Sequence, residues 1–98
     1  MAMFMTRVEL HAAYSSDYDK LHEAMKRQGF TTTITAGDGT VYALPTAEYH
    51  YVGQATQAQV LEKAKAAANS TGKSFGTIVT ESNGSTWDGL PVVRRKVA

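Results

Sequence analysis

Polar and apolar residues alternate along the segment 7–12, which reads RVELHA. A period of two is typical of a strand with one buried face, and it places Val8 and Leu10 on the buried side. The opposite face then carries the three polar side chains of this segment. These are Arg7, Glu9 and His11.

Two later segments have the 3.6-residue period of amphipathic helices. The first covers about residues 17–28, where Tyr18, Leu21 and Met25 form an apolar stripe and Gly29 is a natural stop. The second begins at Thr56, which with Gln59 resembles a capping box, and continues to Gly72.

Three further strands are predicted, over residues 30–35, 41–52 and 73–80, with a turn at Gly37–Gly39 and an interruption at Pro45. The resulting order is β-α-β-β-α-β, which is typical of the ferredoxin-like fold. We therefore predict an α+β protein with one four-stranded antiparallel sheet and two helices on one of its faces. The first and third strands should lie side by side.

The length of 98 residues favours a single domain over residues 1–98. We expect residues 1–5 and 92–98 to be flexible, although the last segment is also compatible with an extra C-terminal strand. Cysteine is absent, so disulfides and thiolate metal sites are excluded. Apolar runs are too short to span a membrane, and no export signal is recognisable, which predicts a soluble cytoplasmic protein.

Charge alone does not identify a partner, because the formal net charge is only +1. Two short basic clusters occur, one at the expected end of the first helix and one near the C-terminus. A cation at a helix end also has a purely structural explanation. If these clusters and an exposed tyrosine contact RNA, the binding residues are Arg27, Lys26, Tyr14, Arg94 and Arg95.

The catalytic hypothesis concerns two histidines. If Tyr49 points into the core, His50 joins His11 on the open face of the sheet, within one or two cross-strand positions. Two imidazoles can act as acid and base when RNA is cleaved by its own 2′-hydroxyl, while Arg7 stabilises the charge that develops on phosphorus. Ordinary surface histidines are the simpler explanation. No spacing indicates a metal site, and no nucleotide-binding or serine-hydrolase motif is present, so no cofactor is expected.

Four strings carry a family resemblance: residues 7–11 (RVELH), 17–22 (DYDKLH), 44–51 (LPTAEYHY) and 56–64 (TQAQVLEKA). In this order the chain resembles the GhoS family from about Arg7 to Pro91. That resemblance implies a ferredoxin-like fold and a bacterial endoribonuclease antitoxin of a type V toxin-antitoxin system, which cleaves the mRNA of a small membrane-active toxin. It supplies no catalytic residues.

The first interpretation is therefore a regulator of the GhoS kind that binds or cleaves single-stranded RNA without a metal. Unstacked bases expose the phosphodiester to a protein that lacks a deep pocket. The alternative is a non-catalytic interaction module that dimerises or binds another protein through the open sheet face or an edge strand.

Overall fold

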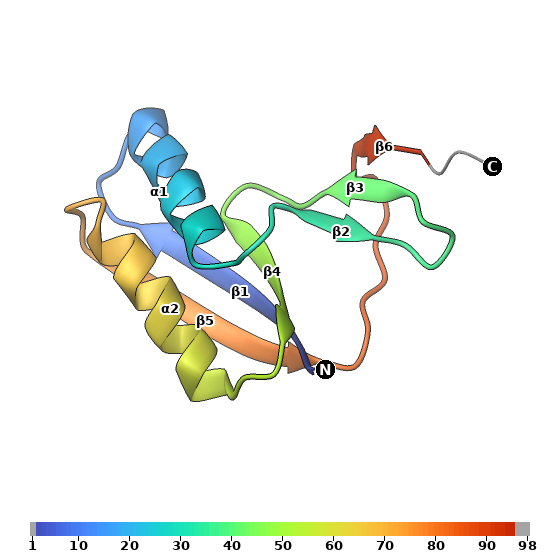
Figure 1. Ribbon diagram of the computed structural model, residues 1–98. Coiled ribbons are helices and arrows are strands. Elements are labelled where there is room, and N and C mark those ends of the chain that lie inside the picture. Colours follow the sequence, from blue (N-terminus) through green and yellow to red (C-terminus); the bar gives the residue numbers. More distant parts are fainter. Residues whose placement is uncertain (1, 96–98) are drawn as a thin grey trace.

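A computed structural model describes residues 2–95 of the chain (Figure 1). It contains two helices and six strands, in the α+β class that the sequence predicts. In chain order they are β1 (Ala2–Leu10), α1 (Ser15–Arg27), β2 (Thr33–Thr35), β3 (Val41–Ala43), β4 (Glu48–Gly53), α2 (Gln57–Asn69), β5 (Phe75–Ser82) and β6 (Val92–Arg94).

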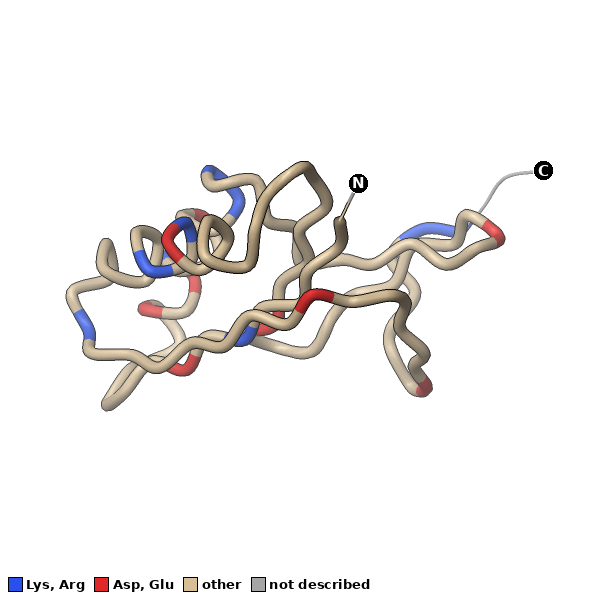
Figure 2. Tube along the Cα trace, turned by 90° about the horizontal axis from the view of Figure 1, so that it is seen from below, with Lys and Arg blue, Asp and Glu red and all other residues tan. Residues whose placement is uncertain are grey.

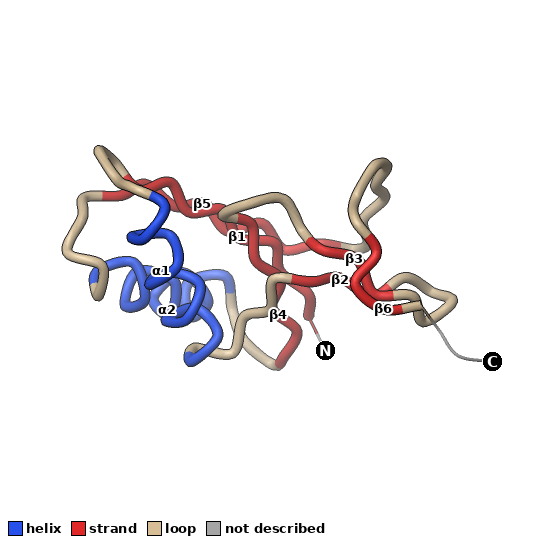
Figure 3. The backbone as a smooth tube through the Cα atoms, turned by 90° about the horizontal axis from the view of Figure 1, so that it is seen from above, coloured by secondary structure: helices blue, strands red, loops and turns tan. Residues whose placement is uncertain are grey.

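The main sheet has the order β4-β1-β5, and all of its pairs are antiparallel. Both helices cover the same face of this sheet, and β1 lies beside β4, as predicted (Figure 3). Alternation along β1 sends Phe4 and Val8 under the helices, where both are fully buried. They meet Leu21 and Met25 of α1 and the small alanine face of α2 in one apolar core.

The predicted single four-stranded sheet is wrong. Strands β2, β3 and β6 form a second three-stranded sheet, which extends away from the helices (Figure 1). Thr31 pairs with His50 of β4 through two backbone hydrogen bonds of 2.8 and 2.9 Å. The next residue, Thr32, already accepts a hydrogen bond from the Leu44 N–H, so the chain leaves β4 after one bridge and pairs with β3 instead.

The structure also assigns strands to both segments that were expected to be flexible. Residues 2–5 lie in β1, between β4 and β5. Residues 92–94 form β6 on β3, which corresponds to the extra C-terminal strand left open by the sequence. Residue 1 and residues 96–98 lie outside the described part of the chain.

Both helices begin close to their predicted positions. Thr56 Oγ1 accepts a hydrogen bond from the Gln59 N–H at 3.1 Å, and the Gln59 side chain accepts one from the Thr56 N–H at 2.9 Å, which confirms the predicted capping box. At α1, the Asp17 carboxylate accepts from the Tyr14 N–H at 2.9 Å. Neither α1 nor α2 is long and apolar enough to cross a membrane.

Candidate active site

The face of the main sheet that points away from the helices carries polar residues in a defined register. On β1, Met5 lies between His50 and Thr80, and Arg7 lies between Glu48 and Ile78. Glu9 faces only Gly76, because β4 does not extend that far. The open face therefore changes from a three-stranded surface to a two-stranded one at the C-terminal end of β1.

Four polar residues lie at this end of β1, and we call them the His11 cluster: Arg7 and Glu9, which line one hollow, and His11 and Ser74, which contact each other. The His11 N–H donates to the Ser74 carbonyl at 2.9 Å, which holds the residue beside the start of β5. His11 Nδ1 lies 3.3 Å from Ser74 Oγ, and His11 Nε2 lies 3.6 Å from Glu9 Oε1. The imidazole is thus positioned between a hydroxyl and a carboxylate.

The His11 cluster is accessible to a large substrate. The side chains of His11 and Glu9 are 52% and 71% exposed. A shallow hollow of about 250 Å³ adjoins them, lined by Arg7, Glu9, Gly76, Thr77 and Ile78. Gly76 keeps this hollow open, since a Cβ atom at this position would meet nothing within 4 Å.

Arg7 brings a cation to the same face. Its guanidinium Nη1 lies 3.1 Å from Glu48 Oε1, across the β1–β4 pair. An exposed ion pair of this kind contributes only about 0–1 kcal/mol, so an incoming phosphate can replace Glu48 at little cost.

The proximity expected for His11 and His50 is wrong. His50 faces Met5, and His11 follows Met5 by six residues, a separation of about 20 Å at about 3.4 Å per strand residue. Alternation along β4 does place His50 on the open face. There His50 lines a different hollow of about 200 Å³, whose other lining residues include Met3, Ile34 and Trp87. Burial there lowers the pKa of His50. The two imidazoles cannot act on one phosphodiester.

Among the residues proposed to bind RNA, Tyr14 is brought to the His11 cluster. It is 76% exposed, and Lys73 Nζ lies 5.9 Å from the centre of its ring. Lys73 directly precedes Ser74, so an aromatic ring and a cation adjoin the cluster, and Lys73 Nζ also lies 3.9 Å from Asp17 Oδ2. Such a pair can stack a base and contact a phosphate.

The two basic clusters lie elsewhere. Lys26 and Arg27 are exposed in the last turn of α1, where Lys26 approaches Glu23 at 3.8 Å. Arg94 lies in β6 opposite Val41, and Arg95 follows it. Figure 2 shows lysine and arginine distributed along the molecule rather than gathered on one surface. The structure therefore does not bring these four residues to the His11 cluster.

The third histidine has a structural role. His22 Nδ1 lies 2.6 Å from the hydroxyl of Tyr49, a side chain that is fully buried. Burial raises the pKa of the Tyr49 phenol strongly, so the hydroxyl keeps its proton. This hydrogen bond fixes α1 on β4.

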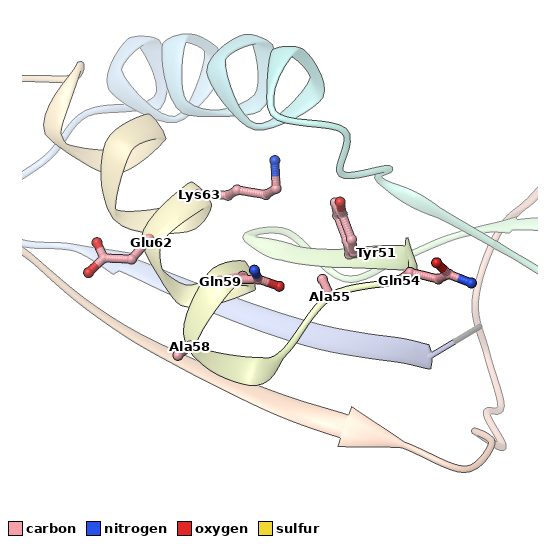
Figure 4. Close-up of a pocket in the computed structure, with 7 residues that line it drawn as sticks. All are labelled: Tyr51, Gln54, Ala55, Ala58, Gln59, Glu62 and Lys63. Atoms are coloured by element: carbon pink, nitrogen blue, oxygen red, sulfur yellow. The ribbon is translucent and has the colours of Figure 1, made fainter.

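A larger hollow lies on the helix side, at the opposite end of the main sheet. It measures about 590 Å³ and is lined by Tyr51, Gln54, Ala55, Ala58, Gln59, Glu62 and Lys63 (Figure 4). Lys63 Nζ is 5.9 Å from the centre of the Tyr51 ring. Its lining offers no imidazole. Within residues 2–95, no three His, Asp or Glu side chains are grouped so as to hold a metal ion.

Sequence reasoning missed two members of the His11 cluster. Alternation places Glu9 on the correct face, but alternation alone does not show that its carboxylate contacts His11. Nothing in the sequence around Ser74 indicates its contact with His11, since that contact depends on the register between β1 and β5. A carboxylate two residues before a histidine on one strand face was the available clue.

The open face of the antiparallel sheet thus carries a carboxylate, an imidazole and a guanidinium, which are groups that acid–base chemistry on an extended polymer uses. The chain belongs to the GhoS family: a family model described as "Endoribonuclease GhoS" matches residues 1–89. The resemblance noted in the sequence is thereby confirmed, and RNA cleavage is the activity of the family. A search of curated proteins found no match.

Proposed function

We propose that the protein is an endoribonuclease that cleaves single-stranded RNA without a metal, at the His11 cluster. One observation carries the proposal: the Glu9 carboxylate lies 3.6 Å from the His11 imidazole, with the Arg7 guanidinium on the same open face. A base, an acid and a cation are the groups that phosphodiester cleavage by the 2′-hydroxyl needs.

In the proposed reaction, the Glu9 carboxylate accepts the proton of the ribose 2′-hydroxyl. The 2′-oxygen forms a bond to phosphorus, and the bond from phosphorus to the 5′-oxygen breaks. His11 donates a ring N–H proton to that leaving 5′-oxygen. Arg7 neutralises charge on the non-bridging oxygens, and the products are a 2′,3′-cyclic phosphate and a 5′-hydroxyl.

Flexible RNA fits the shape of the site better than a duplex does. The His11 cluster is a shallow, open surface, and in-line attack by the 2′-oxygen requires a backbone free to rotate. Tyr14 can stack an unpaired base, and Lys73 can contact its phosphate. We infer a cytoplasmic antitoxin that acts on the mRNA of a toxin, in keeping with the family.

The test compares His11→Ala and Glu9→Gln with Glu62→Gln on a defined RNA in EDTA, since Glu62 is exposed on α2 and pairs with Lys65. We expect the first two to reduce cleavage by about 10²–10⁴-fold, as for the loss of a general acid or base. Glu62→Gln should cleave the same RNA at the rate of the unmodified protein. Circular dichroism checks folding, and end-group analysis should show a cyclic phosphate.

Two results would contradict this proposal. Equal cleavage by His11→Ala would remove the cluster from catalysis. A 5′-phosphate product that disappears in EDTA would indicate metal-assisted attack by water instead.

A second candidate function rests on the edge of the main sheet. Strand β5 is eight residues long and pairs with β1 on one side only, among the described residues. An unpaired edge of this length can add a strand from a partner or from a second copy of the chain. Sedimentation of purified protein that shows a dimer, together with absence of RNA cleavage, would favour this function over the first.

A further inference from the structure

A groove lies at the junction of the two sheets. Two adjoining hollows of about 390 and 200 Å³ share the side chains of Ile34, Ser85 and Trp87. Their combined size is within the range of small-ligand pockets, which is about 300–1,000 Å³. We call this space the junction groove.

Aromatic and apolar side chains provide the walls of the junction groove. Met5 of β1 and Ile34 of β2 both line the larger hollow, together with Leu44 and Leu90. The Trp87 ring packs at 64° against the Tyr42 ring, with centroids 5.4 Å apart. This contact holds an indole in place as a stacking surface.

Three ionisable side chains give the junction groove its polar character. Glu48 and Asp88 line the larger hollow, and His50 lines the smaller one. No lysine or arginine is among the described lining residues, and the Arg7 guanidinium approaches the groove only through its ion pair with Glu48. Two carboxylates repel a phosphate, so the lining favours the base of a nucleotide over its phosphate.

Carboxylates accept hydrogen bonds and cannot donate them when ionised. They therefore pair with a base that offers N–H donors, as Glu and Asp do with the amino group of cytosine. Burial lowers the pKa of His50, so its ring is neutral at pH 7 and offers one donor and one acceptor. Two carboxylate acceptors and a neutral imidazole are together suited to recognising the edge of a base.

We propose that the junction groove binds one unpaired base of the RNA substrate, stacked near Trp87, and selects a base with an exocyclic amino group. This inference rests on the proposed function, because it names a specificity subsite for the same reaction. Single-stranded RNA is generally recognised by stacking of a splayed base and hydrogen bonds to its edge.

The register sets where this base lies relative to the cleaved bond. Met5 lines the junction groove, and Glu9 of the His11 cluster follows it by four residues on the same face of β1. At about 3.4 Å per residue, the two sites are about 14 Å apart. The recognised base therefore belongs to a nucleotide near the scissile linkage but not to the ribose that attacks.

Trp87 is the only tryptophan of the chain, so its fluorescence reports on the groove directly. We would titrate the full chain with 2′-O-methyl trinucleotides, which cannot be cleaved, containing a central adenosine, cytidine or uridine. The expected result is saturable quenching, with adenosine or cytidine bound at least about fivefold more tightly than uridine, the size of one modest hydrogen-bond discrimination.

Asp88→Asn should reduce this preference by about fivefold, because an amide presents a donor as well as an acceptor. Glu62→Gln is the matched control, since Glu62 is exposed on α2 and pairs with Lys65 at 3.4 Å. Its trinucleotide preference should equal that of the unmodified protein. Circular dichroism of each variant confirms that the fold is retained.

The outcomes separate this inference from the proposed function. RNA cleavage without any response of Trp87 would overturn the base site and leave the endoribonuclease intact. Selective quenching in a protein that cleaves no RNA would support the base site and overturn catalysis. Equal quenching by all three trinucleotides would also overturn the base site. So would a change in Trp87 fluorescence that a protein partner causes and RNA does not.

Discussion

Gly76 allows a test of the His11 cluster in which stability and activity should change in opposite directions. The residue lies in β5 directly opposite Glu9, and a Cβ atom there would meet nothing within 4 Å. Glycine within a strand costs about 0.5–1 kcal/mol relative to alanine, and β-branched residues are favoured in strands. Gly76→Val should therefore raise the free energy of unfolding by about 0.5–1 kcal/mol.

The same substitution should impair cleavage. Opposite residues on a sheet face have Cβ atoms about 4.5–5.5 Å apart, so the valine methyl groups would occupy the space next to the Glu9 carboxylate. This space is the hollow through which the ribose must reach Glu9. A displacement of about 1 Å at a reacting centre can cost about 10²-fold in rate, so we expect a loss between tenfold and 10²-fold. Gly76→Ala should lose less.

The assay combines urea unfolding, followed by circular dichroism, with kcat/KM for a short fluorescent RNA. Thr80→Val is the matched control, because Thr80 lies on the same face of β5 but opposite Met5. The kcat/KM of Thr80→Val should stay closer to that of the unmodified protein than the kcat/KM of Gly76→Val does. If Gly76→Val is stabilised and cleaves RNA at an unchanged rate, the ribose does not enter above Gly76 and the proposed site is wrong.

Three further predictions follow from single residues. Tyr49→Phe removes the hydrogen bond to His22 and should cost about 1 kcal/mol at pH 7. Because the folded-state pKa of Tyr49 is raised, the stability that its phenol contributes is complete below pH 10 and is lost as the pH rises above 10. The difference in free energy of unfolding between the unmodified protein and Tyr49→Phe should therefore narrow in urea titrations at alkaline pH. His50 has a lowered folded-state pKa, so its contribution is present above about pH 6.5 and is lost as the pH falls; His50→Gln should flatten the acid side of the stability profile. Tyr14→Leu should raise KM more than it lowers kcat in RNA cleavage, because the exposed ring contributes stacking rather than chemistry.

Local patterns in the sequence predicted the elements and their faces. Alternation identified the buried side of β1 at Val8 and Leu10, and both are buried in the structure. The Thr56–Gln59 pair located the start of α2 because capping is a contact between residues three apart. The position of β4 beside β1 followed from the order of the elements. Each of these features depends on short-range chemistry or on a strong topological preference.

The register between strands could not be predicted in the same way. Period-two alternation gives the face of a residue but not its partner on the next strand. Residues 2–5 carry no polar alternation, and they were therefore not recognised as part of β1. Met3 and Met5 are half-buried against the junction groove, so both faces of this half-strand are covered and the sequence lacks the expected polar face. Because β1 begins at Ala2 rather than near Arg7, His50 pairs with Met5 and lies far from His11 along the strand.

The ion pair between Arg7 and Glu48 links the two sites that we propose on the open face. Arg7 belongs to the His11 cluster, and Glu48 lines the junction groove, so one 3.1 Å contact spans them. A phosphate that binds Arg7 competes with Glu48 for the guanidinium and leaves the carboxylate available to an amino group of a base. Since an exposed ion pair contributes at most about 1 kcal/mol, this exchange is inexpensive. Phosphate binding in the active site and base recognition in the groove should therefore reinforce each other, which favours an RNA that fills both over a free nucleotide that fills one.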